Sequence, residues 1–391
     1  MGKLGRITWR LPQHVQLSPG QLRSFAGAVE PHDGRFVEEL QFGSNPGNLR
    51  MLKHVPAGLQ KSLPLVVVLH GCKQTAGGYD RGAGWSSLAD QYGFALLFPE
   101  QKRENNPNNC FTWFDAADTS RGMGEAASIR SMIGSLIAKG GIDPTRIFVT
   151  GLSAGGAMTS VMLASYPEIF SAGAIVAGLP YGAAGTVQEA FNSMYKGAHK
   201  TAEDWGALVR RGSKHSGRWP RVSVWHGSAD KTVVPANAIE IVKQWTDVHG
   251  LMITSAEKSD GAGFSKSVWR DATGRDVVES IIIRDLAHGT PIRSSGAGES
   301  CGEPGPFLLD VGISSSHHIA RFFGLIAPTV DARPDEKFHR TAAAVHPERR
   351  RSDMASDEPV KTDEVWTSTP RGGNISDAIT DALIAAGLMK R

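Results

Sequence analysis

Cysteine is scarce in this sequence, and its scarcity excludes two ways of holding a chain together. Cys72, Cys110 and Cys301 are the three cysteines among 391 residues. Three is an odd number and far too few for a disulfide-stapled scaffold, and the spacing matches no zinc-ligand motif. We therefore expect a fold that is stabilised by a hydrophobic core, with no metal and no cofactor.

Excess charge of one sign and long hydrophobic runs are missing too. The 42 basic and 39 acidic side chains leave a formal net charge of +3, and no basic stripe with interleaved aromatic residues occurs, so nucleic acid is not an expected partner. The longest apolar runs, such as residues 65–69, are too short to cross a bilayer, and the N-terminus lacks the apolar stretch of a secretory signal peptide. These absences predict a soluble, cytoplasmic protein without an integral membrane segment.

What the sequence does contain is an alternation of strand and helix patterns. Strand patterns, most of them continuous apolar runs of the kind buried in a parallel sheet, occur at residues 65–69, 94–98, 146–150, 172–177, 221–225, 267–270 and 280–283. Helical periodicity occurs at 85–92, 124–139, 154–165, 236–248 and 315–323. We expect Pro99 to end the second of these strands, and residues 280–283 to form the last.

The segment before these patterns differs, because residues 35–42 and 49–55 alternate between apolar and polar side chains. The turn sequence Gly43-Ser-Asn-Pro-Gly47 separates them, which is typical of an antiparallel hairpin. The whole pattern predicts an α/β fold with a mostly parallel central sheet, helices on both faces and an antiparallel N-terminal hairpin.

Composition divides the chain into four parts. Residues 1–33 are predicted to be an irregular arm, and residues 34–327 one large α/β domain. Within this domain, residues 182–219 are longer than a minimal crossover and form either a cap over the active site or an ordinary helical excursion. Residues 328–373 are rich in proline, charge, serine and threonine, which predicts a disordered linker, and residues 374–391 are predicted to form a short amphipathic helix.

The residues Gly151-Leu-Ser153-Ala-Gly155 form a candidate nucleophile motif. They follow a predicted strand and open a predicted helix, and this setting distinguishes a nucleophile elbow from a glycine-serine loop without chemistry. Glycines on both sides remove side chains that would collide with the sharp turn, so that the hydroxyl of Ser153 is presented above the sheet. The motif is typical of serine hydrolases with the α/β-hydrolase fold.

A serine hydroxyl is a weak nucleophile and needs a base and an acid, which follow the serine in chain order in this architecture. His288 lies in the loop after the last predicted strand, where it can reach Ser153. Asp230 lies in the turn after the strand at residues 221–225, and we favour it as the acid. Asp247 belongs to a helical pattern and Asp285 lies too close to the histidine in sequence, so both are weaker candidates.

The remaining part of such a site is an oxyanion hole and a substrate wall. Cys72 follows the first buried strand and Ala154 follows the nucleophile, and their backbone N–H groups are the predicted oxyanion donors. A nucleophilic role for the Cys72 thiol is disfavoured because no base is placed for it. Trp113, Trp225 and Tyr181 are candidates for the substrate wall, although each is equally well explained as a core aromatic residue.

Five separated motifs resemble those of poly(3-hydroxybutyrate) depolymerase-type esterases, which are similar to feruloyl and acetylxylan esterases. They are Leu69-His-Gly-Cys-Lys-Gln-Thr-Ala76, Asn109-Cys-Phe-Thr-Trp-Phe114, Gly151-Leu-Ser-Ala-Gly-Gly156, Val224-Trp-His-Gly-Ser-Ala-Asp230 and Gly305-Pro-Phe-Leu-Leu-Asp-Val-Gly-Ile-Ser314. The resemblance covers residues 35–326. It implies a Ser153–Asp230–His288 triad and, as substrate, a short-chain ester or a polyester of hydroxy acids.

The resemblance has two further implications. Secreted members pair the cysteines that match Cys72 and Cys110, whereas a cytosolic pool would keep both reduced. An extracellular location is therefore the alternative to the cytoplasmic one. The competing functions are a feruloyl or acetylxylan esterase with the same triad, and a non-catalytic binding protein of the same fold.

Overall fold

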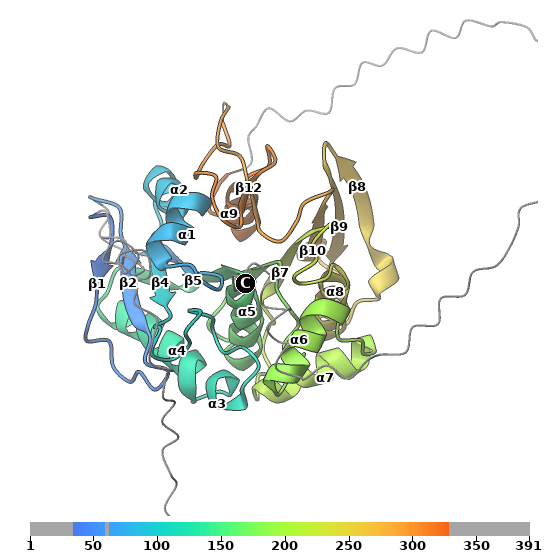
Figure 1. The fold of residues 1–391 in the computed structure, drawn as a ribbon, viewed down its shortest axis with the longest axis horizontal. Coiled ribbons are helices and arrows are strands. Elements are labelled where there is room, and N and C mark those ends of the chain that lie inside the picture. Colours follow the sequence, from blue (N-terminus) through green and yellow to red (C-terminus); the bar gives the residue numbers. More distant parts are fainter. Residues whose placement is uncertain (1–33, 59–61, 297, 328–391) are drawn as a thin grey trace, which may run out of the picture.

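The computed structural model describes residues 34–327, with gaps at residues 59–61 and 297. The predictions for residues 1–33, 328–373 and 374–391 lie outside the described residues. Within the described part, one sheet lies at the centre and carries helices on both faces (Figure 1). The predicted α/β fold with a mostly parallel sheet and an antiparallel N-terminal hairpin is confirmed.

The central sheet has ten strands in the order β1-β2-β4-β3-β5-β6-β7-β10-β9-β8. Their bounds are β1 (Val37–Glu38), β2 (Arg50–His54), β3 (Leu63–Leu69), β4 (Ala95–Glu100), β5 (Ile142–Leu152), β6 (Ala172–Val176), β7 (Arg221–Gly227), β8 (Glu257–Gly261), β9 (Phe264–Arg270) and β10 (Asp276–Ile283). The strands from β4 to β10 in this order are parallel, and the pairs at the two ends are antiparallel. The parallel strands therefore present their carboxyl ends at one edge, where ligands bind in open α/β sheets.

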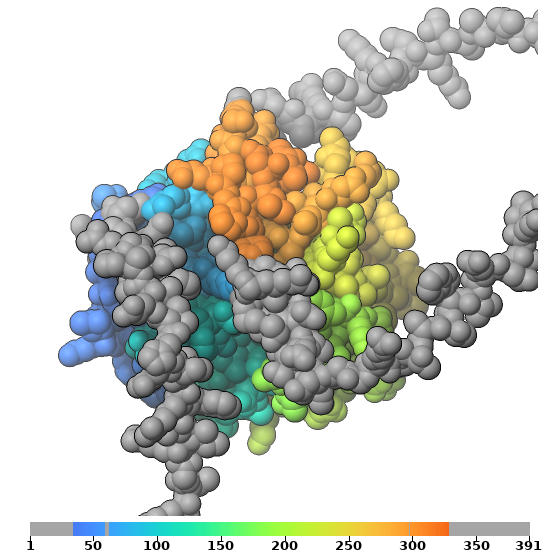
Figure 2. Space-filling view, viewed as in Figure 1, coloured from blue at the N-terminus to red at the C-terminus, as the bar shows by residue number. Residues whose placement is uncertain are grey.

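Helices follow most of the parallel strands. Their bounds are α1 (Ala76–Ala83), α2 (Trp85–Tyr92), α3 (Ala116–Thr119), α4 (Gly124–Ala138), α5 (Ala154–Ser165), α6 (Val187–Lys196), α7 (Ala202–Gly212), α8 (Ala236–Val248) and α9 (Ser315–Phe323), with a 3₁₀ turn at Ile253–Ser255. The described residues after β10, orange in the space-filling view, lie between the blue strands at the β1 end of the sheet and the yellow β8–β9 region (Figure 2).

Two hydrophobic cores lie on the opposite faces of the sheet. Alternate residues of β3 divide between them, with Val67 in the core under α4, α5 and α8 and Val66 in the core under α1, α2 and α9. Because both faces are covered, the strand reads as a continuous apolar run. Among the helices of the described residues, none has the length and apolarity that a bilayer span requires.

Three details differ from the sequence expectations. Strand β4 continues through Pro99 to Glu100, because β3 pairs with β4 only up to Leu97 and the missing N–H of Pro99 therefore breaks no bond to β3. Strand β10 is not the last, since β11 (Thr290–Ile292) and β12 (Leu308–Asp310) form a small parallel sheet after it. Strand β8 was missed because its side chains are polar and mostly exposed.

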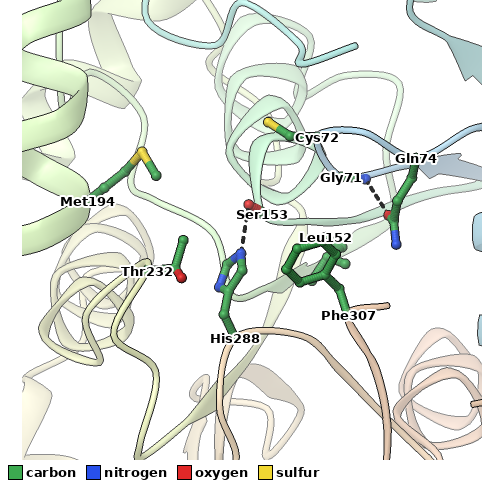
Figure 3. A pocket seen from close by; sticks show the side chains of 9 residues that line it. All are labelled: Gly71, Cys72, Gln74, Leu152, Ser153, Met194, Thr232, His288 and Phe307. Atoms are coloured by element: carbon green, nitrogen blue, oxygen red, sulfur yellow. Dashed lines mark hydrogen bonds between the residues drawn. The ribbon is translucent and has the colours of Figure 1, made fainter. Parts of the chain in front are cut away.

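The segment at residues 182–219 contains α6 and α7. Helix α7 packs against α8 through the buried Trp205, whose indole N–H donates to Glu240 at 2.6 Å. Helix α6 carries Met194, which lines the cavity beside Ser153 (Figure 3). The segment thus combines an ordinary packed helix with one that borders the candidate active site.

Candidate active site

The turn between β5 and α5 holds Ser153 in a backbone conformation that side chains rarely adopt, with φ of 57° and ψ of −116°. Such strain persists only where the surroundings enforce it. A Cβ atom on Gly155 would lie 2.3 Å from the carbonyl oxygen of Leu69, and one on Gly151 would lie 2.4 Å from that of Gly155. Both flanking glycines are therefore required by close backbone packing.

Ser153, His288 and Asp230 form a continuous hydrogen-bonded row. The Oγ atom of Ser153 lies 2.9 Å from Nε2 of His288, and Nδ1 of His288 lies 2.7 Å from Oδ2 of Asp230. Figure 3 shows the imidazole of His288 pointing at Ser153 across the cavity. With the ring proton on Nδ1, the imidazole donates to Asp230 and accepts from the serine hydroxyl, which is the tautomer that a general base needs.

Asp230 is buried, and its hydrogen-bond partners favour its ionised form. Its Oδ1 atom accepts from the backbone N–H groups of Thr232 and Val233, each at 2.9 Å. Burial by itself raises the pKa of Asp230, but hydrogen bonds from His226 and His288 outweigh burial and hold that pKa below its usual range. The carboxylate therefore stays charged and can orient His288 at any ordinary assay pH.

The two weaker acid candidates lie elsewhere. Asp247, on α8, forms an ion pair with Arg210 at 2.7 Å. Asp285 is exposed, and its backbone N–H donates to the hydroxyl of Ser228. The hydrogen bonds of the described residues thus connect His288 to Asp230 and to neither rival.

Cys72 and Cys110 form a disulfide, as the family resemblance implied. The bridge rules out a free-thiol nucleophile at Cys72. In the hydrogen bonds of the described residues, the backbone N–H groups of Cys72 and Ala154 have no acceptor, so both are available to an incoming oxygen atom. The neighbouring N–H of Gly71 is already taken by the side chain of Gln74 at 2.8 Å.

The cavity beside Ser153 is small and largely apolar. Its volume is about 30 Å³. Its lining residues are Gly71, Cys72, Gln74, Leu152, Ser153, Met194, Thr232, His288 and Phe307. The ring of Phe307 contacts His288 edge to face, with the ring centroids 6.0 Å apart.

Trp113, Trp225 and Tyr181, the predicted substrate wall, do not line this cavity. Trp113 is buried in the core against Phe114. Trp225 points to the α9 face of the sheet, where its indole N–H donates to Ser223.

Tyr181 is held through its backbone N–H, which donates to the side chain of Gln244 at 3.0 Å. Sequence reasoning did not single out Met194, Thr232 and Phe307, which do line this cavity. The available signal was weak, namely the position of Phe307 inside one of the family motifs and of Met194 inside the candidate cap segment.

Comparison with known proteins identifies the family. The family described as "Esterase PHB depolymerase" matches residues 50–266, more than half of the chain. The chain belongs to this family. This PHB depolymerase-type esterase is 46% identical over 286 residues to poly(3-hydroxyalkanoate) depolymerase C of Paucimonas lemoignei, which covers 73% of this chain and 69% of that protein.

Other similar proteins extend the comparison to feruloyl and acetyl xylan esterases. Feruloyl esterase B of Neurospora crassa is 40% identical over 217 residues, covering 54% of this chain and 73% of that protein. The solved structure of an acetyl xylan esterase from Aspergillus awamori superposes with a TM-score of 0.64 and 27% identity, covering 75% of this chain and all of that one. The predicted family is confirmed, and the PHB depolymerase-type esterase is a carboxylic ester hydrolase. In the described part of the chain, no group of three or more His, Cys, Asp or Glu side chains is placed to hold a metal ion.

Proposed function

We propose that the protein hydrolyses carboxylic esters through an acyl-enzyme formed on Ser153. The observation that carries this proposal is the pair of short contacts from His288, 2.9 Å to the serine Oγ and 2.7 Å to Asp230. His288 accepts the hydroxyl proton as Ser153 attacks the ester carbonyl, and Asp230 stabilises the imidazolium that forms. His288 then protonates the leaving alcohol, and water repeats the same steps on the acyl-enzyme.

The negative charge of the tetrahedral intermediate is placed at the backbone N–H groups of Cys72 and Ala154. Both amides lack a protein acceptor among the described residues, and Ala154 opens α5, so the positive end of the helix dipole faces the same point. Removing one such donor typically costs about 3–4 kcal/mol of transition-state stabilisation and lowers the rate accordingly. The disulfide from Cys72 to Cys110 holds the first of the two donors in place.

The preferred substrate in this proposal is an aliphatic ester, either short-chain or an oligomer of a hydroxy acid. A cavity of about 30 Å³ beside the nucleophile accepts a small aliphatic group, while the rest of a chain lies across the open surface. The 46% identity to a poly(3-hydroxyalkanoate) depolymerase supports the same choice. The second candidate, a feruloyl or acetylxylan ester, is favoured by the 40% identity to a feruloyl esterase.

The test of the catalytic residues compares Ser153→Ala and Asp230→Asn with Asp285→Asn on p-nitrophenyl butyrate. We expect kcat to fall by at least about 10⁴-fold for Ser153→Ala and by about 10³–10⁴-fold for Asp230→Asn. Asp285→Asn is the same substitution at an exposed loop residue, and this variant should retain full activity. Retained activity in Ser153→Ala would exclude the proposed nucleophile.

A second test separates the substrate classes and the non-catalytic alternative. Hydroxybutyrate oligomers, methyl ferulate and acetylated xylan are assayed side by side, and the proposal expects the highest kcat/KM on the oligomers. A fluorophosphonate probe should label the protein and not Ser153→Ala. Absence of labelling in the unmodified protein would favour a binding protein of the same fold.

A further inference from the structure

A second cavity lies on the α9 face of the sheet, between α9 and the strands β7, β9 and β10. Its volume is about 390 Å³, within the range of small-molecule sites and far larger than the cavity beside Ser153. Its apolar walls include Trp225, Phe264, Ile313 and Phe322. The two cavities share no lining residue, so the second is a separate site.

Arg221, at the start of β7, lines this cavity and carries one buried hydrogen-bond donor without a partner. Its Nε atom is buried and has no hydrogen-bond partner among the described residues. The guanidinium lies over the ring of Phe322, 4.4 Å from the ring centroid, so its plane is held in place. A buried donor without a partner is rare in folded proteins and points to a missing acceptor.

The other charged groups of the cavity each have at least one ionic or hydrogen-bond partner, although the Nε atom of Arg321 is also without one among the described residues. Glu279 accepts from Lys266 at 2.6 Å and from Ser223 at 2.7 Å. Asp276 forms an ion pair with Arg270 at 2.7 Å, and Arg321 forms one with Glu299 at 3.3 Å.

Burial and the nearby Arg275 lower the pKa of Arg221 to about 10, which leaves the side chain a cation at neutral pH without a bound counter-ion. The site therefore combines the Arg221 cation, which forms no ion pair among the described residues, with a wall that is partly apolar and partly charged.

We propose that this cavity binds a small organic carboxylate whose apolar body lies against Trp225, Phe264 and Ile313 and whose carboxylate pairs with Arg221. A guanidinium offers parallel N–H groups that match a carboxylate, and a partly desolvated pair of this kind is stronger than one in water. If the proposed ester hydrolysis is correct, the enzyme releases acids of this class, but the binding itself does not depend on that activity.

The test measures binding of 3-phenylpropanoate to the full chain by isothermal titration calorimetry. The titration is made on the unmodified protein, on protein treated with phenylmethylsulfonyl fluoride to fill the Ser153 site, and on two arginine variants. We expect Arg221→Gln to raise Kd at least about tenfold, because the charge pair is lost. Arg211→Gln, which removes an exposed arginine on α7, should leave Kd within about twofold.

Two further arms make the result decisive. The neutral analogue 3-phenylpropan-1-ol should bind at least about tenfold more weakly than the acid. Ile313→Trp, which fills the cavity and retains Arg221, should abolish binding, and it replaces Arg221→Gln if that variant does not fold. Equal binding of acid and alcohol, equal Kd in the variants, loss of binding after sulfonyl fluoride treatment, or no binding to the unmodified protein would each overturn the proposal.

Discussion

The side-chain oxygen of Gln74 accepts a hydrogen bond from the backbone N–H of Gly71 at 2.8 Å. Both residues line the cavity beside Ser153, and the bond is visible at the cavity edge in Figure 3. Gln74 thereby fixes the loop that carries Cys72, and it occupies the amide next to the proposed oxyanion donor. Gln74 contacts no substrate atom in the proposed mechanism. Through the Gly71 amide it can nevertheless set the direction of the Cys72 backbone N–H, which does.

We predict that Gln74→Met lowers kcat for p-nitrophenyl butyrate by about tenfold and leaves KM within about twofold. Methionine has a similar length but no acceptor for the Gly71 amide, so the loop loses an interaction that matters most when the oxyanion forms. Gln91→Met, at an exposed position on α2, is the matched control and should match the unmodified protein. An increase in KM with unchanged kcat would instead assign Gln74 to substrate binding.

The fold and the three residues of the row could be predicted because their signals are local. The motif around Ser153 dictates its own turn, and Asp230 and His288 each follow a strand of the parallel set. Since β7 and β10 are adjacent and parallel, their carboxyl ends meet at one edge and bring the two loops together. The chain order of the three residues and their positions after strand ends were therefore sufficient to predict the row.

The lining of the cavity beside Ser153 could not be predicted, because it depends on which face of a strand a side chain occupies and on distant loops. Trp225 and His226 are consecutive in β7 and point to opposite faces, so an aromatic residue near the acid turned out to lie in the α9 core. Met194 and Phe307 reach the cavity from α6 and from the loop before β12, and no residue spacing links them. The Gln74 contact was hidden for a different reason, since its partner is a backbone group.

The disulfide between Cys72 and Cys110 provides a second prediction. The two residues are 38 positions apart, and closing a loop of that length stabilises the folded state by about 4 kcal/mol in the chain-entropy account. Replacing both by alanine should lower the free energy of unfolding by about 2–4 kcal/mol and reduce kcat, because the Cys72 amide becomes mobile. Urea unfolding and p-nitrophenyl butyrate hydrolysis measure the two effects.

Cys301→Ser supplies the control for this experiment. Cys301 is a free, half-buried cysteine whose sulfur lies 3.1 Å from the hydroxyl of Ser314, so serine can take over that contact. This variant should retain both stability and activity. A double alanine variant with unchanged kcat would show that the bridge stabilises the fold without positioning the oxyanion donor.

Glu125, at the start of α4, is a buried carboxyl group that links two loops near the disulfide. Its Oε1 atom accepts from Gln101 at 2.5 Å and from the hydroxyl of Thr112 at 3.0 Å, and its Oε2 atom accepts from the Thr112 backbone at 2.9 Å. Gln101 also donates to the carbonyl of Cys110 at 3.2 Å. Burial, assisted by the charge of Asp118, raises the pKa of Glu125 to about 8.

The raised pKa predicts that the protein loses stability as the pH rises towards 8. Between the ordinary value of 4.5 and about 8, folded Glu125 keeps a proton that the unfolded chain has released. Unfolding then releases a proton, so the free energy of unfolding falls with rising pH, by up to about 5 kcal/mol over this window. Glu125→Gln is neutral throughout and should lack this loss. Urea midpoints measured across the window for both proteins test the prediction, and parallel pH profiles would mean that Glu125 is ionised in the folded state already at low pH.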